Sequence, residues 1–257
     1  MKRSLALLLF AGCASETLSG DPVSLVWKPV EGTSETVRWH CSLNFKFIQV
    51  LIGKEQPVDR RITIAHKYVS TIGGVANGRV QARTVEIQSA TFDVSGTGEP
   101  RHGEIVPKGT TLTIERRDGR IIETPPNSRS GLTLEPDWVD FLPPRPVRVG
   151  EVWEPDPASC RSLALAMAVE GVLNVRVKAL LASIADSNAV IELAIVFDFK
   201  TQGMASTMSL RGPLSVDRST GRPVAFKIAG TIKLDSQPAE VRAFQGSCEL
   251  EWSSTPK

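Results

Sequence analysis

The sequence is poor in the side chains that catalytic and metal sites use most often. Its 257 residues include three His and four Cys. It contains no H-E-x-x-H, C-x-x-C or EF-hand pattern, so the common zinc and calcium sites have no signature here. It also lacks a G-x-S-x-G nucleophile elbow, and Gly73, Gly74 and Gly78 are typical of a turn between strands. These absences predict a protein that is not an enzyme and that uses no metal or cofactor.

The His residues are also spaced unfavourably for a metal site. His40 adjoins Cys41, and neighbouring residues on a strand point to opposite faces, so the two cannot share one ion. His66 and His102 have no Cys, His or acid at a recurrent ligand spacing. We expect His66 to face water on a strand and His102 to lie in a loop. A Ser-His-Asp triad assembled from distant residues is the least favoured class of function.

The sequence also lacks a large excess of charge of either sign. The chain has 30 basic and 28 acidic residues and a formal net charge of +2 at pH 7. Lys2 and Arg3 supply two of the positive charges, and no acid lies before Cys13. The chain from Cys13 onward is therefore electrically balanced. Such a body has neither the basic footprint of a nucleic-acid-binding protein nor a polybasic patch for anionic membranes, so we expect no nucleic-acid partner.

No apolar run reaches transmembrane length, but a short one stands at the N-terminus. Two basic residues precede the apolar segment Leu5–Ala11, and the small residues Ala11 and Gly12 precede Cys13. The segment is too short to cross a bilayer core of about 30 Å as a helix. Its order of basic region, apolar core and small residues is typical of a cleaved signal peptide. We predict that residues 1–12 are removed.

The last four residues of this region, Phe10–Cys13, resemble the bacterial lipobox, in which Leu, a small residue and Ala or Gly precede Cys. Phe10 departs from Leu at the first position. In that family the Cys becomes the acylated N-terminus, so the resemblance implies a lipid such as palmitate on Cys13. Each buried acyl CH₂ contributes about 0.8 kcal/mol, so more than one chain holds a domain firmly on a membrane. The alternative is an ordinary secretory peptide followed by an incidental Cys.

The segment after Cys13 begins with small and polar residues. We therefore predict that residues 13–30 form the lipid anchor and a flexible tether. Ala14, and not Asp, follows the anchor Cys, which suits delivery to the outer membrane in bacteria that use that sorting rule. We expect a cell-envelope protein on the periplasmic face of the outer membrane.

From residue 34 onward, apolar residues recur with a period of two. The stretch "ETVRWHCSLNFKF" alternates in this way, and residues 79–94 repeat the pattern. This is typical of half-buried antiparallel strands. Asp118-Gly119 predicts a hairpin turn, and residues 186–188 and 217–221 predict slightly longer hairpin loops. One apolar face of the first long strand carries six residues: Val37, Trp39, Cys41, Leu43, Phe45 and Phe47.

Helix signals are few. Residues 156–171 begin with Asp156 as a cap and Pro157 at the first helical position, and Gly171 suits the exit. The same run also alternates as a strand would, but its alanines favour helix. Many long strands in one chain must hide their edges. We predict a mainly β fold: a single large curved antiparallel sheet, a half-barrel or open barrel, with one or two short helices, formed as one domain by residues 31–257.

Two stretches carry a family resemblance: "FLPPRPVRVGEVWEPD" (141–156) and "LRGPLSVDRSTGRPVAFKIAGTIKL" (210–234). Together with the lipobox, they resemble a group of uncharacterised bacterial lipoproteins with a large antiparallel β domain. That group is similar in architecture to lipoprotein carriers of the LolA/LolB/LppX type. The resemblance implies a hydrophobic cavity for acyl chains, although a fold does not by itself imply a function.

The remaining Cys residues suggest a disulfide. Cys41 lies on the apolar face of an early strand, and Cys248 lies on the apolar face of the last one. First and last strands often become neighbours when a sheet curls, and an oxidising compartment permits one bridge. We hypothesise a Cys41–Cys248 disulfide. A bridge from Cys160 to either residue, or three buried thiols, are the alternatives.

The favoured function is non-enzymatic binding of an apolar ligand, a lipid or an acyl chain, in the concave sheet of a membrane-anchored lipoprotein. Trp39, Leu43, Phe45 and Phe47 are the candidate lining residues. The same side chains would equally fill a closed core. The alternative function is structural: a scaffolding lipoprotein that engages an envelope protein through an exposed strand edge or loop.

Overall fold

Strands dominate the chain. The computed structural model describes residues 19–117, 120–125, 141–157, 163, 171–201, 204–235 and 239–257. Their strands are β1 (Ser19–Val23), β2 (Ser34–Leu51), β3 (Lys54–Ala76), β4 (Arg79–Gly96), β5 (Arg101–Glu104), β6 (Thr111–Arg117), β7 (Arg120–Thr124), β8 (Val147–Val149), β9 (Val152–Trp153), β10 (Val172–Ile184), β11 (Asn188–Thr201), β12 (Met204–Asp217), β13 (Pro223–Leu234) and β14 (Val241–Pro256).

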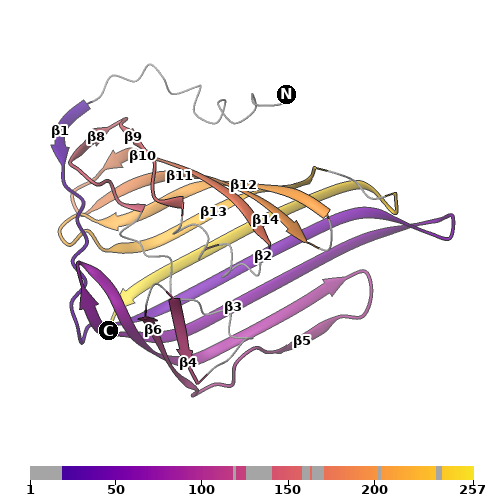
Figure 1. The fold of residues 1–257 in the computed structure, drawn as a ribbon, viewed down its shortest axis with the longest axis horizontal. Helices are drawn as coiled ribbons and strands as arrows, with labels where there is room; N and C mark the ends of the chain where they lie inside the picture. Colours follow the sequence, from indigo (N-terminus) through magenta and orange to yellow (C-terminus); the bar gives the residue numbers. More distant parts are fainter. Residues whose placement is uncertain are drawn as a thin grey trace.

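One large antiparallel sheet contains 12 of these strands, in the order β7-β6-β4-β3-β2-β14-β13-β12-β11-β10-β9, with β5 beside β4. Figure 1 shows that the sheet is strongly curved. Within the described ranges, β7 and β9 end the order and do not pair with each other, so the sheet is open. The predicted mainly β fold with one large antiparallel sheet is confirmed. The helix predicted over 156–171 lies mostly outside the described residues and stays a prediction.

Most neighbouring strands are consecutive hairpins, but the centre of the sheet joins distant parts of the chain. β14 pairs with β2 from Val241 opposite Gln49 to Pro256 opposite Glu35. The first and last long strands are thus neighbours, as the sequence predicted. Their matching two-residue periods make this pairing possible, because each strand presents one apolar face to the same side.

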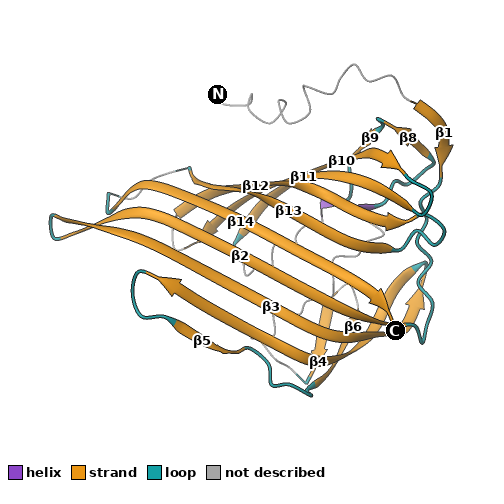
Figure 2. Cartoon of the chain, turned by 180° about the vertical axis from the view of Figure 1, so that it is seen from behind, coloured by secondary structure: helices purple, strands orange, loops and turns teal. Residues whose placement is uncertain are grey.

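The buried side chains form one cluster on one face of the curved sheet. Val37 of β2, Leu112 of β6 and Ile191 of β11 are all fully buried members of it, although their strands lie far apart in the sheet order. Curvature turns this face inward, as Figure 2 shows from the opposite side. A glycine helps two strands to approach: a Cβ at Gly230 would lie 1.8 Å from the carbonyl oxygen of Ser209, so no larger residue fits there.

The N-terminal segment joins the folded body at an earlier residue than the sequence predicted. Ser19–Val23 forms β1, which pairs with β8, and Leu25 and Trp27 are buried in the core. The backbone at Val26 passes so close to Gly221 that a Cβ there would lie 2.3 Å from its carbonyl carbon. Residues 19–30 of the predicted tether thus include a strand and buried side chains, and residues 13–18 lie outside the described residues.

The hairpin loops match the sequence signals where they are described. Residues 185–187 connect β10 to β11, and residues 218–222 connect β12 to β13, so both loops overlap the predicted positions. In the second loop, hydrogen bonds from Ser219 and Thr220 to the carboxylate lower the pKa of Asp217 to about 2. The Asp118-Gly119 turn lies outside the described residues. No helix in the described part of the chain is long and apolar enough to cross a membrane.

Candidate functional site on the inner face of the sheet

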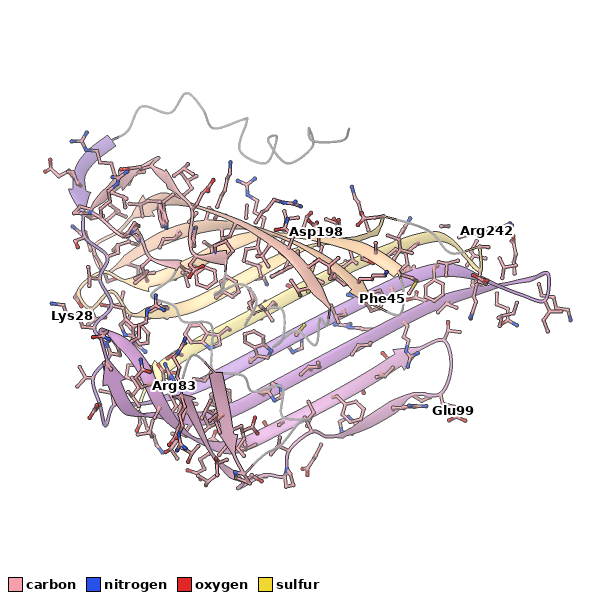
Figure 3. All side chains as sticks on the ribbon, in the orientation of Figure 1. Lys28, Phe45, Arg83, Glu99, Asp198 and Arg242 are labelled. Carbon is pink, nitrogen blue, oxygen red and sulfur yellow. The ribbon has the colours of Figure 1, made fainter. Side chains whose placement is uncertain are left out.

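We call the buried face of the sheet the inner face. On β2 it carries every second residue from Glu35 to Phe47, and on β14 it carries Cys248, Leu250, Trp252 and Ser254. The inner face changes character along these two strands. It is polar at the end near the C-terminus, apolar in the middle, and aromatic toward the far end, where Figure 3 labels Phe45 well away from Arg83.

The polar end is a network of buried and partly buried charges centred on Glu35. Arg83 of β4 donates to Glu35 at 3.1 Å and to the Ser70 hydroxyl at 2.9 Å, and Arg83 is only 4 % exposed. Arg222 contacts the same carboxylate at 3.4 Å and donates to Ser254 at 3.0 Å. The Ser254 hydroxyl also bonds to Glu35. The network ties β2 to β4 on one side and to β14 and the start of β13 on the other.

The middle of the inner face is a row of side chains that crosses six strands. Successive strand pairings place these residues side by side, and all of them are buried. Trp39 was predicted to line a cavity, and the structure places it within this row. The members, from β12 to β4, are Leu214, Phe226, Trp252, Trp39, His66 and Ala90.

His66 does not face water, contrary to the expectation from sequence. It lies on the inner face directly opposite Trp39 and is 5 % exposed. The signal was present in the alternation of β3, because His66 shares its parity with Ile62, Ile64 and Tyr68. Burial lowers the pKa of His66 to about 4, so its ring is neutral at neutral pH.

Among the polar atoms of this row, Nε1 of Trp39 and Nδ1 of His66 are shielded from solvent and have no hydrogen-bond partner among the described residues. The structure thus places an indole N–H donor and an imidazole nitrogen on directly paired positions of β2 and β3. Buried polar groups in native proteins almost always have hydrogen-bond partners, so unsatisfied atoms on directly paired residues are unusual.

Cys41 and Cys248 meet one step further along the inner face. Cys41 is opposite Leu250, and Cys248 is opposite Leu43, so the two Cys residues are diagonal neighbours on one face. A hydrogen bond with the Cys248 thiol, together with burial, raises the pKa of Cys41 well above its usual range. The structure contains both as buried thiols. The disulfide between them stays a prediction, and Cys160 lies outside the described residues, as does Cys13.

The far end of the inner face carries three clustered aromatic rings. The ring centroid of Phe244 lies 6.1 Å from that of Phe45 and 6.3 Å from that of Phe47. All three rings are half-buried, whereas Leu43 is buried. Of the four predicted lining residues, Trp39 and Leu43 therefore belong to the core, and Phe45 and Phe47 remain partly open to solvent.

The opposite, outer face is polar. Two grooves lined mainly by its residues have volumes of about 640 and 430 Å³. The larger one contains Lys227, which forms ion pairs with Glu249 and Glu251 of β14. Charged side chains that pair with each other in water are typical of a solvated sheet face, so we assign no ligand to these grooves.

Metal chemistry finds no support in the described ranges. No group of three or more His, Cys, Asp and Glu side chains there is arranged to hold an ion. His102 lies on the short strand β5 instead of in a loop, and its Nδ1 is 3.7 Å from the Asp93 carboxylate. Both side chains are mostly exposed. The site is therefore described by its apolar face and by the unsatisfied polar atoms of Trp39 and His66.

The Pro-rich motif of residues 141–156 serves the core. Trp153 of β9 is buried, and its indole N–H donates to the carbonyl oxygen of Phe141 at 3.2 Å. Phe141 itself is fully buried. The motif thus supplies packing and a satisfied hydrogen bond, which is the ordinary role of a large aromatic side chain in a β protein.

Comparisons with known proteins do not place the chain in a family. No family model and no curated protein matches it. Solved structures with weak similarity include lipovitellin (8 % identity over 88 % of this chain and 25 % of that one, TM-score 0.45). A second is a putative outer membrane lipoprotein-sorting protein domain from Vibrio parahaemolyticus (10 % identity, 85 % of both chains, TM-score 0.12). A third is DynF from Micromonospora chersina (10 % identity, 93 % of this chain and 87 % of that one, TM-score 0.21).

These likenesses are too weak to carry an argument. The chain spans only a quarter of the length of the lipovitellin chain that it matches. What the protein does must therefore be argued from its own inner face.

Proposed function

We propose that the protein is a non-enzymatic lipoprotein of the bacterial cell envelope that binds an apolar ligand, a lipid or an acyl chain, on the inner face of its sheet. The main support is the cluster of half-buried rings at one end of a long buried apolar face: Phe45, Phe47 and Phe244. A face that served only as core would gain more by burying these rings fully, because aromatic side chains remove large areas from water. A hydrophobic face that continues to the solvent is typical of a ligand entrance.

In this proposal Cys13 carries the lipid anchor after removal of residues 1–12. The open sheet is then held close to the periplasmic face of the outer membrane, where acyl chains are available. Residues 13–18 separate the anchor from β1, so the tether is short and β1 stays near the membrane. The proposal requires no metal, cofactor or nucleic acid.

The test uses the full chain, expressed in a bacterium that processes lipoproteins and extracted in mild detergent. Native mass spectrometry is expected to find a co-purified acyl-chain compound. After delipidation, added lipid should raise the temperature of unfolding, because a ligand that binds only the native state stabilises it. The double variant Phe45→Ser, Phe47→Ser should lose most of this shift. Lys227→Gln on the outer face is the control and should keep it.

Two results together would contradict the proposal. One is delipidated protein whose unfolding temperature no lipid changes. The other is an absence of co-purified acyl compounds from the detergent extract. A Lys227→Gln variant that loses lipid binding as strongly as the Phe variant would place the site on the outer face instead.

A second candidate function is docking of an envelope protein, and one observation favours it. The hairpin between β2 and β3 ends in Leu51 and a fully exposed Ile52, which has a positive φ of 50°. A β-branched residue in this conformation is uncommon and strained. A photo-crosslinking residue at position 52 should then give one discrete protein adduct in cells, and the same residue at position 227 should give none. A lipid adduct, or no adduct, at position 52 would contradict docking.

A further inference from the structure

The unsatisfied polar atoms of Trp39 and His66 need a physical explanation. They lie in a row whose other members, Leu214, Phe226, Trp252 and Ala90, are apolar or aromatic. Nε1 of Trp39 and Nδ1 of His66 have no partner among the described residues. A buried donor or acceptor without a partner lowers the stability of the fold, because the group has lost its hydrogen bonds to water. Two apolar side chains at these positions would not have this penalty. A polar group that binds between them would remove the cost.

The geometry limits what that group is. Directly opposite residues on paired strands have Cβ atoms about 4.5–5.5 Å apart, so one small group can contact both side chains. An indole Nε1–H only donates, and a neutral imidazole nitrogen either donates or accepts. A hydroxyl satisfies both, because its oxygen accepts from Trp39 while its proton goes to His66. An ester carbonyl oxygen also satisfies both, when His66 carries its proton on Nδ1.

The charges around the Trp39–His66 pair exclude anionic head groups. An anionic head group such as a phosphate needs cationic partners when it leaves water. Arg83 and Arg222 of the polar end are both already bound to Glu35, and Glu35 lies two inner-face positions from Trp39 on β2. The row itself contributes no fixed charge at neutral pH. A neutral oxygen head group therefore fits this position, and a phosphate does not.

We propose that Trp39 and His66 form the polar anchor of the lipid site and select amphiphiles with a neutral hydroxyl or ester head group. This inference rests on the proposed function and specifies its ligand. The head group lies at the Trp39–His66 pair, and the alkyl chain runs along β2 past Cys41 and Leu43 to the ring of Phe47. That path is about 26 Å long at about 3.3 Å per residue of strand, so it suits a long chain.

The test separates head-group selection from apolar binding. Delipidated full-chain protein is loaded with the neutral dye Nile red, which is then displaced by three chain-matched compounds: dodecanol, dodecyl phosphate and dodecane. Wild-type protein should bind dodecanol about tenfold more tightly than either of the others. Trp39→Phe and His66→Leu should each reduce the preference for dodecanol over dodecane several-fold, and they should leave the affinity for dodecane unchanged.

A matched control distinguishes an anchor from a packing role. Trp153 also presents a buried indole, but its N–H already donates to Phe141. Trp153→Phe should therefore lower the unfolding temperature without changing the dodecanol preference. Trp39→Phe should do the reverse: it removes an unsatisfied donor, so the ligand-free protein should be as stable as the wild type or more so.

The possible results lead to different conclusions. If Nile red binds and all three compounds displace it equally, the anchor is refuted and apolar binding stands. The same holds if the two variants keep the wild-type preference, which would mean that ordered water satisfies both atoms. If Nile red does not bind at all, the proposed function fails together with the anchor. Should His66→Leu fail to fold, Trp39→Phe, which keeps an aromatic ring, decides the matter alone.

Discussion

Removal of the Glu35 carboxylate should destabilise the protein strongly, because two arginines depend on it. Arg83 is 4 % exposed, and it would lose its carboxylate partner while it keeps the neutral Ser70 hydroxyl. Breaking one side of a buried ion pair costs about 3–5 kcal/mol. Glu35 is slightly exposed, with 15 % of its side-chain surface accessible, so the lower end of that range applies. We expect Glu35→Ala to lower the free energy of unfolding by about 3 kcal/mol, which for a chain of this size lowers Tm by roughly 6–12 °C.

The double variant Glu35→Leu, Arg83→Met provides the sharper test. Replacing both members of a buried pair by apolar residues of similar size is often neutral. The double variant should therefore recover most of the stability that the single change loses. Urea unfolding monitored by tryptophan fluorescence measures the wild type, Glu35→Ala, the single variants Glu35→Leu and Arg83→Met, and the double variant. Unchanged m-values would show that the unfolding transitions are comparable.

A control pair fixes the scale of the measurement. Lys46 and Asp59 form an ion pair at 3.1 Å, but both side chains are more than 60 % exposed, so Asp59→Asn should have little effect. The reasoning is refuted if Glu35→Ala behaves like Asp59→Asn. It is also refuted if the losses from Glu35→Leu and Arg83→Met simply add in the double variant, since residues in one network should couple.

Three further predictions concern single sites. Non-reducing peptide mapping of protein purified from the periplasm should find Cys41 linked to Cys248, and a linked Cys160 peptide would overturn the pairing. The folded-state pKa of His66, about 4, lies below the unfolded value of 6.5, so the unfolded state binds more protons between these values, and stability is full above pH 6.5 and falls toward pH 4. Denaturant unfolding should show this loss, worth about 3 kcal/mol, in the wild type and not in His66→Leu. Cys13→Ser should abolish palmitate labelling and release the protein from the membrane fraction; unchanged labelling would exclude Cys13 as the anchor.

The two-residue period of the sequence was enough to predict the sheet and its central pairing. The alternation from Val37 to Phe47 predicts the inner face of β2, and together with the alternation of β14 it predicts that Cys41 lies near Cys248. The alternation of β3 also indicates that His66 is buried. The prediction that His66 faces water relied instead on the polarity of the histidine side chain. For His66, the position in the two-residue period of the strand predicts burial correctly, and the polarity of the residue does not.

Other features depend on contacts that no local pattern encodes. Glu35, Arg83 and Arg222 are far apart in sequence, and each is a charge that usually lies at the surface. They meet only because β2 joins β14 and because Arg222 directly precedes β13. The packing of residues 19–30 was missed for a related reason. Leu25 and Trp27 are separated by Val26, which is apolar as well. This short stretch therefore has no alternation that would distinguish a docked segment from a tether.

The arrangement along β2 argues for a ligand more strongly than for a purely structural role. A purely structural protein is most stable when its core is complete. The unsatisfied polar atoms of Trp39 and His66 would destabilise such a protein without any compensating interaction. The same holds for the half-exposed rings of Phe45 and Phe47. The unsatisfied polar atoms and the half-exposed rings lie on the same face of the sheet, and an apolar stretch of β2 connects them. Departures of this kind concentrate at functional sites, because binding recovers what folding gives up. The polar network at Glu35 closes the other end of that path and fixes the strands on either side. In the proposed function, a ligand would therefore enter from the aromatic end, and its head group would lie beside Trp39 and His66.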